Sequence, residues 1–327
     1  MQTDRPPYCA IIKIVGVGNG AINVVDQLIE GNLDGIESIA ISGDTNHLMS
    51  STADWKFDVS GHRCPADWVK LAPAEIEQAA EACRDQIAAA LDDAELVIMV
   101  VGEGGHTGTT VAPVVARIAR SLGALTIGLA TRPFSFEGRR RAERATAGID
   151  RLRAETDMLI VVRNDHLLPP ESQAVSVLES FRLSDQVLVR VVKSLIGPLG
   201  PSLYSFDLAD LKDAARGASW AYVGLGSASG KDRGRVATEQ AIASPLLEAP
   251  ASQARTLLLV MTSTAETPID DLTAASRPLD SPDYCDTNVV IHPVIDVTLG
   301  DEMQVTAIVT GPNPNTVAFV ASARQAR

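Results

Sequence analysis

Glycines and threonines that could bind phosphate are concentrated in residues 100–113, VVGEGGHTGTTVAP. The apolar residues 96–101 before this stretch are typical of a buried strand, and the VVARIARSL sequence after it has apolar residues at helical spacing. A strand, a glycine-rich turn and a helix together present backbone N–H groups and a helix N-terminus to an anion. The sequence therefore predicts a phosphate-binding loop here, with a flexible turn that binds nothing as the alternative. The glycines and hydroxyl donors of this loop are Gly102, Gly104, Gly105, Thr107, Gly108 and Thr109.

A second glycine loop, GVGNGA at residues 16–21, follows the apolar residues 10–15 and precedes another helical pattern. Taken alone, G-x-G-x-x-A is also typical of a dinucleotide-binding turn. In that alternative Asp44, after the next predicted strand at residues 38–42, would bind the ribose, although it follows Gly16 by more than the usual spacing of about 20 residues. A dinucleotide oxidoreductase therefore stays open as a minor hypothesis at this point.

Short apolar runs alternate with helical patterns over the first half of the chain. Further strands are predicted at residues 55–59, 125–130 and 158–162, and one helix is predicted to run from Pro73 to Leu91, with Ile76, Ala80, Cys83 and Ile87 on one face. Alternating strands and helices indicate an α/β domain with a doubly wound, mostly parallel sheet.

A long helix is predicted over residues 172–196, ending at Gly197 and Pro198. Beyond residue 219 the segments WAYVGLGSASG, TLLLVMTST, NVVIHPVIDVTLG and MQVTAIVTG are typical of strands, with one helix, RVATEQAIASPLL, between them. We expect four parts: a nucleotide-binding domain at 8–171, the long core helix at 172–198, a loop and connecting helix at 199–218, and a smaller α/β domain at 219–315.

Composition narrows the possible partners. The 327 residues carry a net charge of −13, and only 4% of them are aromatic. Both values disfavour nucleic acid as a partner, and no apolar run approaches the roughly 20 residues of a membrane span. The four scattered cysteines include no C-x-x-C pair, which favours reduced thiols in a cytoplasmic protein and gives no metal site.

Several segments resemble one protein family. GGHTGTT resembles the tubulin signature GGGTGTG, and TRPFSFEGRRR, VVRNDHLL, LESFRLSDQVL, SFDLADLK, AIASPLLEA and VIDVTLGDE are similar to segments of the bacterial division protein FtsZ. The resemblance covers residues 11–311. The chain is therefore identified as a divergent FtsZ-like member of the FtsZ/tubulin superfamily, which implies a GTPase domain, a long core helix and a second, smaller α/β domain.

The resemblance also implies ligand roles. Phe181 would stack on guanine, and Asp185 would accept from its N1–H and exocyclic amine, which adenine does not offer. Because these two residues are four apart, one helix face can present both. Glu137 would accept from the ribose, Arg141 would lie beside the phosphates or sugar, and Asn164 would face the sugar or base. The remaining predicted ligands, in the two glycine loops, are Asn19, Gly20, Ala21, Ile22, Asn23, Gly105, His106, Thr107 and Gly108.

Without the family, some of these residues have plainer interpretations. A phenylalanine on a helix is more often a core residue than a base platform, and Glu137 and Arg141 could form a surface i,i+4 pair.

Hydrolysis in the family uses two subunits, because an acidic loop of one subunit enters the nucleotide pocket of the next. The family pattern N-x-D-x-x-D corresponds here to Ser205, Asp207 and Asp210, so both carboxylates are kept and the Asn is replaced. Carboxylates can orient a water or hold a cation near phosphate. Asp207 and Asp210 are therefore the predicted catalytic residues, and a solvated acidic loop is the alternative.

The departures from the family are concentrated around the phosphates. The glycine- and alanine-rich loop that would wrap the γ-phosphate corresponds to residues 66–71, ADWVKL, where Trp68 and Val69 prevent the same close backbone approach. Lys70 could supply positive charge, although a plain surface lysine is the more common case. Other replacements are His106 and Thr110 for glycines, Asn19 and Ala21 in the first loop, and residues 42–44, SGD, for the family's NTD.

These observations predict a cytoplasmic, FtsZ-like cytoskeletal protein that binds GTP or GDP, with Mg²⁺ as a candidate companion ion. It would assemble head to tail with itself, with another FtsZ-like protein as a further candidate partner, and would hydrolyse GTP slowly or in an altered way. The alternative is a structural or regulatory module that binds nucleotide without hydrolysis or binds none.

Overall fold

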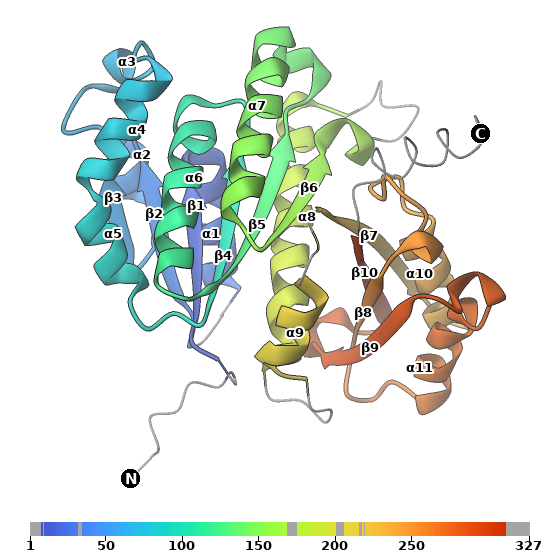
Figure 1. Ribbon diagram of the computed structural model, residues 1–327. Helices are drawn as coiled ribbons and strands as arrows, with labels where there is room; N and C mark the ends of the chain where they lie inside the picture. The colour runs from blue at the N-terminus through green and yellow to red at the C-terminus, as the bar shows by residue number, and fades with distance from the viewer. Residues whose placement is uncertain are drawn as a thin grey trace, which may run out of the picture. The chain divides into compact units, whose positions relative to one another are not determined.

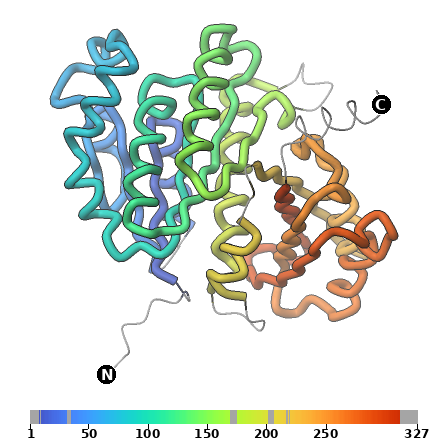
Figure 2. The backbone as a smooth tube through the Cα atoms, viewed as in Figure 1, coloured from blue at the N-terminus to red at the C-terminus, as the bar shows by residue number. Residues whose placement is uncertain are grey.

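The computed structural model describes residues 8, 10–31, 35–168, 175–200, 206–215, 218 and 220–311. The chain divides into two compact units, Met1–Lys193 and Ser194–Arg327. The backbone trace in Figure 2 follows the chain from the first unit, blue to yellow-green, to the second, yellow to red.

Unit 1 is built on six parallel strands in the order β3-β2-β1-β4-β5-β6. This is the order of a doubly wound sheet, in which the chain first builds outward from β1 in one direction and then restarts beside β1 with β4. The carboxyl ends of β1 and β4 are therefore neighbours at the point of reversal, where ligands bind in such folds. The strands are β1 (Ile12–Val17), β2 (Glu37–Ser42), β3 (Trp55–Asp58), β4 (Leu96–Gly102), β5 (Leu125–Arg132) and β6 (Met158–Arg163).

Helices cover both faces of this sheet (Figure 1). Helix α1 (Asn19–Glu30) packs on β1, β2 and β4, whereas α6 (His106–Ser121) and α7 (Arg139–Glu155) pack beside each other on the central strands. Because α6 is also covered by α4 and α5, its buried residues are not confined to one stripe. The other short elements of unit 1 are α2 (Thr45–Ser50), α3 (Pro65–Trp68), α4 (Pro73–Ala82), α5 (Arg84–Leu91), η1 (Ser135–Glu137) and η2 (Asn164–Leu167).

The predicted long helix is α8 (Val177–Ile196), and the chain passes from unit 1 to unit 2 within it. Residues 172–174, which the sequence also assigned to this helix, lie outside the described residues. A 3₁₀ turn, η4 (Gly197–Leu199), follows directly, as expected from the Gly197-Pro198 stop signal. The next described helix is α9 (Leu208–Ala215).

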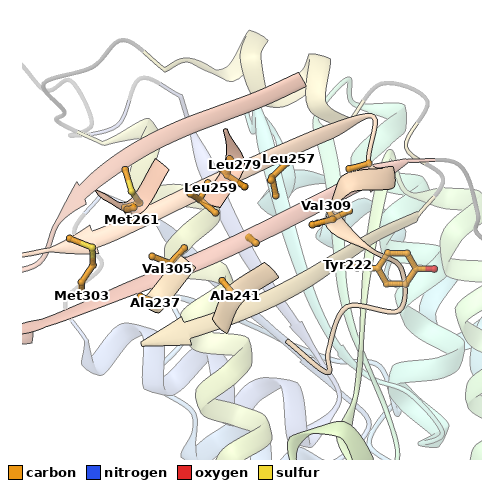
Figure 3. Packing of buried hydrophobic residues seen from close by; sticks show 14 residues of the cluster. Tyr222, Ala237, Ala241, Leu257, Leu259, Met261, Leu279, Met303, Val305 and Val309 are labelled. Atoms are coloured by element: carbon orange, nitrogen blue, oxygen red, sulfur yellow. The ribbon is translucent and has the colours of Figure 1, made fainter. Parts of the chain in front are cut away.

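Unit 2 contains β7 (Trp220–Ser229), β8 (Thr256–Ser263), β9 (Asn288–Ile295) and β10 (Glu302–Gly311) in the order β7-β10-β8-β9. β10 runs antiparallel to both β7 and β8, whereas β8 and β9 are parallel. Helix α10 (Arg233–Ile242) packs on β7 and β10, and α11 (Ile269–Ser276) packs on α10. Figure 3 shows the hydrophobic core between this sheet and its helices, where Leu257, Leu259 and Val305 pack with the small side chains of Ala237 and Ala241. The remaining 3₁₀ turns are η5 (Ala251–Gln253), η6 (Arg277–Leu279), η7 (Pro282–Tyr284) and η8 (Val297–Leu299).

The predicted fold class is confirmed, but two element predictions were wrong. The helix expected from Pro73 to Leu91 is two helices, α4 and α5, which are interrupted at Cys83 (φ −94°, ψ 5°). Apolar spacing could not show this break, because both helices pack on α6 and their buried residues continue the same spacing. The second domain has α11 in addition to the one predicted helix. Its apolar signal is weak, because only Ala274 and Ala275 are buried.

Candidate functional site

The two glycine loops lie against each other at the carboxyl ends of β1 and β4. Gly18 connects β1 to α1 with φ 87°, a conformation that L side chains rarely adopt, and a Cβ added there would lie 3.2 Å from the backbone N of Gly108. A Cβ added to Gly108 would lie 2.6 Å from the carbonyl oxygen of Gly102. Glycine is therefore required at position 18 by the packing of one loop on the other, and at position 108 by the close approach of the second loop to its own backbone. The contact between Gly18 and Gly108 places the first turns of α1 and α6 next to each other.

Gly16 was predicted to belong to the first glycine loop, but the structure gives it a different role. It lies within β1, which ends two residues later than expected, and a Cβ there would lie 2.8 Å from Val25 Cγ2 of α1. Gly16 thus permits close packing of helix on strand, and the phosphate-facing turn of the first loop begins at Gly18.

A pocket of about 570 Å³ opens over these loops within unit 1. Of the predicted ligands, Ile22 and Asn23 do not line it: Ile22 is fully buried in α1, and Asn23 is exposed. The structure brings the other twelve together around the pocket: Asn19, Gly20, Ala21, Gly105, His106, Thr107, Gly108, Glu137, Arg141, Asn164, Phe181 and Asp185.

One end of the pocket carries the aromatic ring and the carboxylate of α8. Phe181 is 38% exposed, and its ring meets those of Phe134 and Phe136 edge to face, with centroids 5.4 and 6.2 Å away. Burial raises the pKa of Asp185 to about 6, and a hydrogen bond from Gln27 offsets only part of that effect. This end therefore offers a flat apolar surface beside a carboxylate that has few partners of its own.

Three other polar groups near this end already have partners. Asn164 is buried, and its side-chain oxygen accepts from the Ser184 hydroxyl at 3.0 Å. Glu137 accepts from the Phe134 backbone N–H at 2.8 Å and forms an ion pair with Arg141. The plain i,i+4 pair considered from the sequence is thus present, and it lies in the wall of the pocket.

Trp68 of α3 lies at the glycine-loop end of the pocket. Its side chain is almost fully buried, and its indole N–H donates to Thr107 Oγ1 at 2.9 Å. A Cβ added to Gly43 would lie 2.2 Å from the indole ring, so only glycine fits beneath it. Trp68 therefore occupies space that the small residues of the family pattern would leave open. Lys70 is exposed and pairs with Asp67 at 2.9 Å, as a plain surface lysine would.

Asn19 and Asp44 belong to a hydrogen-bond network at the same end. The Asn19 amide donates to Asp44 at 3.0 Å and accepts from the Ser42 hydroxyl at 2.7 Å. Asp44 also accepts from the backbone N–H of His47 and so caps the N-terminus of α2. The Asp44 carboxylate therefore has hydrogen-bond partners within the protein, and a ribose is not needed to explain its position.

The sequence did not indicate two further residues of this pocket, Glu103 and Arg144. Arg144 of α7 lies 3.1 Å from Nε2 and 3.3 Å from Nδ1 of His106. Burial, Arg144 and Arg141 together lower the pKa of His106, so its ring is neutral at pH 7. The RRRAER sequence could have signalled a basic helix edge, but not which arginine faces the pocket.

Glu103 belongs to the second glycine loop, and its carboxyl lies beside Gly148 of α7 and near Thr109 of α6. Glu103 is 5% exposed, and neither of its carboxyl oxygens has a well-aligned hydrogen-bond partner among the described residues. Gly148 makes room for it, because a Cβ there would lie 2.2 Å from Glu103 Oε2. Burial raises the pKa of Glu103 to about 7, and the nearby Thr109 hydroxyl and the charge of Arg151 offset this only in part.

The predicted catalytic residues lie in unit 2, at the start of α9. Asp207 accepts from the backbone N–H groups of Ala209 and Asp210, and Asp210 accepts from the backbone N–H of Asp207. This reciprocal arrangement is a capping box. Both residues are exposed, and Asp210 also lines a pocket of about 420 Å³ together with Phe206, Asp213 and Arg255. Ser205 lies outside the described residues.

Two family models match this chain. The GTPase domain of the Tubulin/FtsZ family matches residues 11–169, and the FtsZ family C-terminal domain matches residues 219–313. The chain belongs to the FtsZ/tubulin family. It thus carries the family's GTPase domain and an FtsZ C-terminal domain, and the resemblance stated from sequence is confirmed.

Solved structures of this family agree with that assignment. An FtsZ dimer from M. jannaschii is 28% identical, with a TM-score of 0.83 over 92% of this chain and 88% of that chain. CetZ from Methanosaeta thermophila is 18% identical, with a TM-score of 0.75 over 97% and 91%. CetZ2 from Haloferax volcanii, a GTPgS-bound protofilament, is 19% identical, with a TM-score of 0.74 over 97% and 98%. The two CetZ structures support the fold alone.

The described residues provide neither a metal centre nor a membrane span. Over these residues, no three or more His, Cys, Asp or Glu side chains are grouped so as to hold a metal ion. None of the described helices is long and apolar enough to cross a bilayer.

Replacing Glu103 with Gln tests the burial of this carboxyl. Between pH about 4.5 and about 7 the folded state binds more protons at Glu103 than the unfolded state does, so this residue lowers stability as pH rises through that window. We expect Glu103→Gln to raise the free energy of unfolding by about 3 kcal/mol at pH 8 and to leave it nearly unchanged at pH 4.5. Urea unfolding at the two pH values measures this. Glu143→Gln, an exposed change on α7, is the control, and an equal effect at both pH values would contradict the buried, protonated carboxyl.

Proposed function

We propose that this chain is a guanine-nucleotide-binding cytoskeletal protein that assembles head to tail and hydrolyses GTP slowly, with the hydrolytic site completed between subunits. The observation that carries this proposal is the composition of one pocket. Phe181 and Asp185 are at one end, and two glycine loops with the first turns of α1 and α6 are at the other. A planar base and an anionic phosphate chain are the ligand parts that such ends recognise.

Asp185 supplies the choice of base. A carboxylate accepts hydrogen bonds from N1–H and the exocyclic amine of guanine, whereas adenine presents no such donor pair. Because Asp185 is half-buried, leaving it without these donors carries part of the cost of an unsatisfied polar group. Phe181 supplies the flat surface for stacking, and its ring is already held by two other phenylalanine rings.

The glycine loops supply the phosphate end. The N–H groups at the start of α6 have no partner within that helix, and they favour an anion. Mg²⁺ would be held mainly by the phosphates and water, as is usual for this ion. The nearby carboxylates of Glu137 and Asp44 are already engaged by Arg141 and Asn19.

Hydrolysis between subunits is proposed from the exposed carboxylates of α9. Asp207 and Asp210 face solvent, so a second copy could bring its pocket to them. A contact between two different surfaces repeats without closing and produces a filament.

The second candidate function is a module that binds nucleotide without hydrolysis. The position of Trp68 favours it, because the indole fills the glycine-loop end and uses the Thr107 hydroxyl as an acceptor. A dinucleotide oxidoreductase shares the strand order but gives no reason for a carboxylate beside a stacking ring at the base end.

We expect Asp185→Asn to reduce GDP affinity about tenfold and to abolish the preference for GDP over ADP, since one acceptor becomes a donor. In the unmodified chain, GDP affinity should fall as pH drops below about 6, because protonation removes that acceptor. Calorimetric titration with GDP and ADP at pH 5 and pH 8 measures both effects. Glu179→Gln, exposed on the same helix, is the control. Equal GDP and ADP affinities in the unmodified chain would refute the base assignment.

We expect GTP to bind within about threefold of GDP, because Trp68 fills the space for a terminal phosphate. Trp68→Ala should increase GTP affinity relative to GDP about tenfold or more, which is of the order of one charge-assisted hydrogen bond. Trp55→Ala, on β3 and outside the pocket, is the matched control. A strong GTP preference before substitution would show that Trp68 leaves the phosphate site open.

Turnover should rise more steeply than linearly with protein concentration if the site forms between subunits. Asp210→Asn keeps an oxygen that can cap α9 but removes the charge, so it should abolish phosphate release while GDP affinity stays within twofold. Adding this variant to the unmodified protein should suppress activity more than dilution does. Asp213→Asn, one turn further along α9, is the control. Turnover strictly proportional to concentration, with no large species by light scattering, would favour the non-hydrolysing module.

A further inference from the structure

Arg144 is a cation without a carboxylate partner in the wall of the pocket. Its guanidinium lies beside the His106 ring, and its Nε is buried without a hydrogen-bond partner. Among the described residues, no Asp or Glu pairs with Arg144, whereas Arg139 and Arg141 on the same helix pair with Glu143 and Glu137. Most N–H donors of its guanidinium therefore have no hydrogen-bond partner among the described residues.

The groups around Arg144 do not balance its charge. The pKa of His106 is lowered, so the ring is neutral near pH 7 and adds no charge of its own. Its ring nitrogens lie at similar distances from Nη1, which places the guanidinium against the ring as a whole and leaves its other donors free. The buried carboxyl of Glu103 is influenced by Arg151, and Arg144 is not among the groups that shift its pKa. A partly desolvated cation of this kind is costly unless an anion joins it.

We propose that Arg144 is a phosphate ligand of this pocket and that His106 is a positioning residue that holds the guanidinium toward the phosphate chain. This inference rests on the proposed nucleotide binding and names one of its determinants. The planar fork can bind two phosphate oxygens at once, which an ammonium cannot do. His106 stands where the family's signature loop has glycine, so the ring that supports Arg144 is a departure from that pattern. Arg144 adds side-chain charge at the glycine-loop end of the pocket, where Trp68 bonds to Thr107.

The test compares ligands with and without phosphate on the full chain. Affinities of guanosine, GDP and pyrophosphate are measured by calorimetry for the unmodified protein, Arg144→Gln and Arg140→Gln. Arg140 is a matched control, because it is exposed on α7, does not line the pocket and has no ion pair among the described residues. We expect Arg144→Gln to weaken GDP and pyrophosphate binding at least tenfold and to change guanosine binding less than twofold. Arg140→Gln should change all three less than twofold.

His106→Leu tests the positioning role. It should weaken GDP binding without affecting guanosine, and in combination with Arg144→Gln it should add little, since both changes remove the same contact. A merely structural histidine would instead alter guanosine and GDP binding alike.

The outcomes separate this inference from the proposed function. If the protein binds GDP and Arg144→Gln behaves like Arg140→Gln, the inference fails and nucleotide binding stands. If Arg144→Gln weakens pyrophosphate binding, while guanosine does not bind and GDP binds no more tightly than pyrophosphate, the inference stands and the guanine assignment fails. If neither GDP nor pyrophosphate binds, both are overturned.

Discussion

The reversal of strand order between β1 and β4 is the constraint on which the candidate site depends. It makes the ends of these two strands neighbours, so the turns that follow them must share one small space. Gly18 and Gly108 meet that requirement, because a Cβ at either position would press on the backbone of the second loop. The first turns of α1 and α6 consequently open into the same pocket. The remaining site residues come from three segments around this junction: η1 with the first half of α7, the turn η2 after β6, and the first half of α8.

The two ends of the pocket differ in how many of their polar groups already have hydrogen-bond partners within the protein. At the α8 end Asp185 has one amide partner, and its ionised form is disfavoured by burial, so a ligand that donates hydrogen bonds is favoured there. At the glycine-loop end the indole of Trp68 holds the Thr107 hydroxyl, and Asn19 is tied to Ser42 and Asp44. This difference is what the proposed function expects of a divergent member of the family, in which base recognition is kept and the phosphate end is rebuilt from larger side chains.

Local pattern was sufficient for the alternating elements, the two glycine loops and the helix that presents Phe181 and Asp185 together, because these depend on spacing along the chain. Local pattern was insufficient where packing between segments far apart in sequence decides which residue enters the pocket or where a helix ends. Trp68 could be read as an obstacle to close backbone approach, but its bond to Thr107 joins segments far apart in sequence. Arg144 is one arginine among several in RRRAER, and only the packing of α7 beside α6 selects it. Cys83 continues the apolar spacing, so the break between α4 and α5 left no sign in the pattern.

Whether this pocket holds a guanine nucleotide can be decided by identifying the ligand that the purified protein carries. Protein purified without added nucleotide is denatured, and the released small molecule is identified by ion-exchange chromatography and its absorbance spectrum. We expect GDP or GTP, at a ratio to protein that Asp185→Asn reduces. Release of a nicotinamide dinucleotide or an adenine nucleotide instead would contradict the guanine assignment.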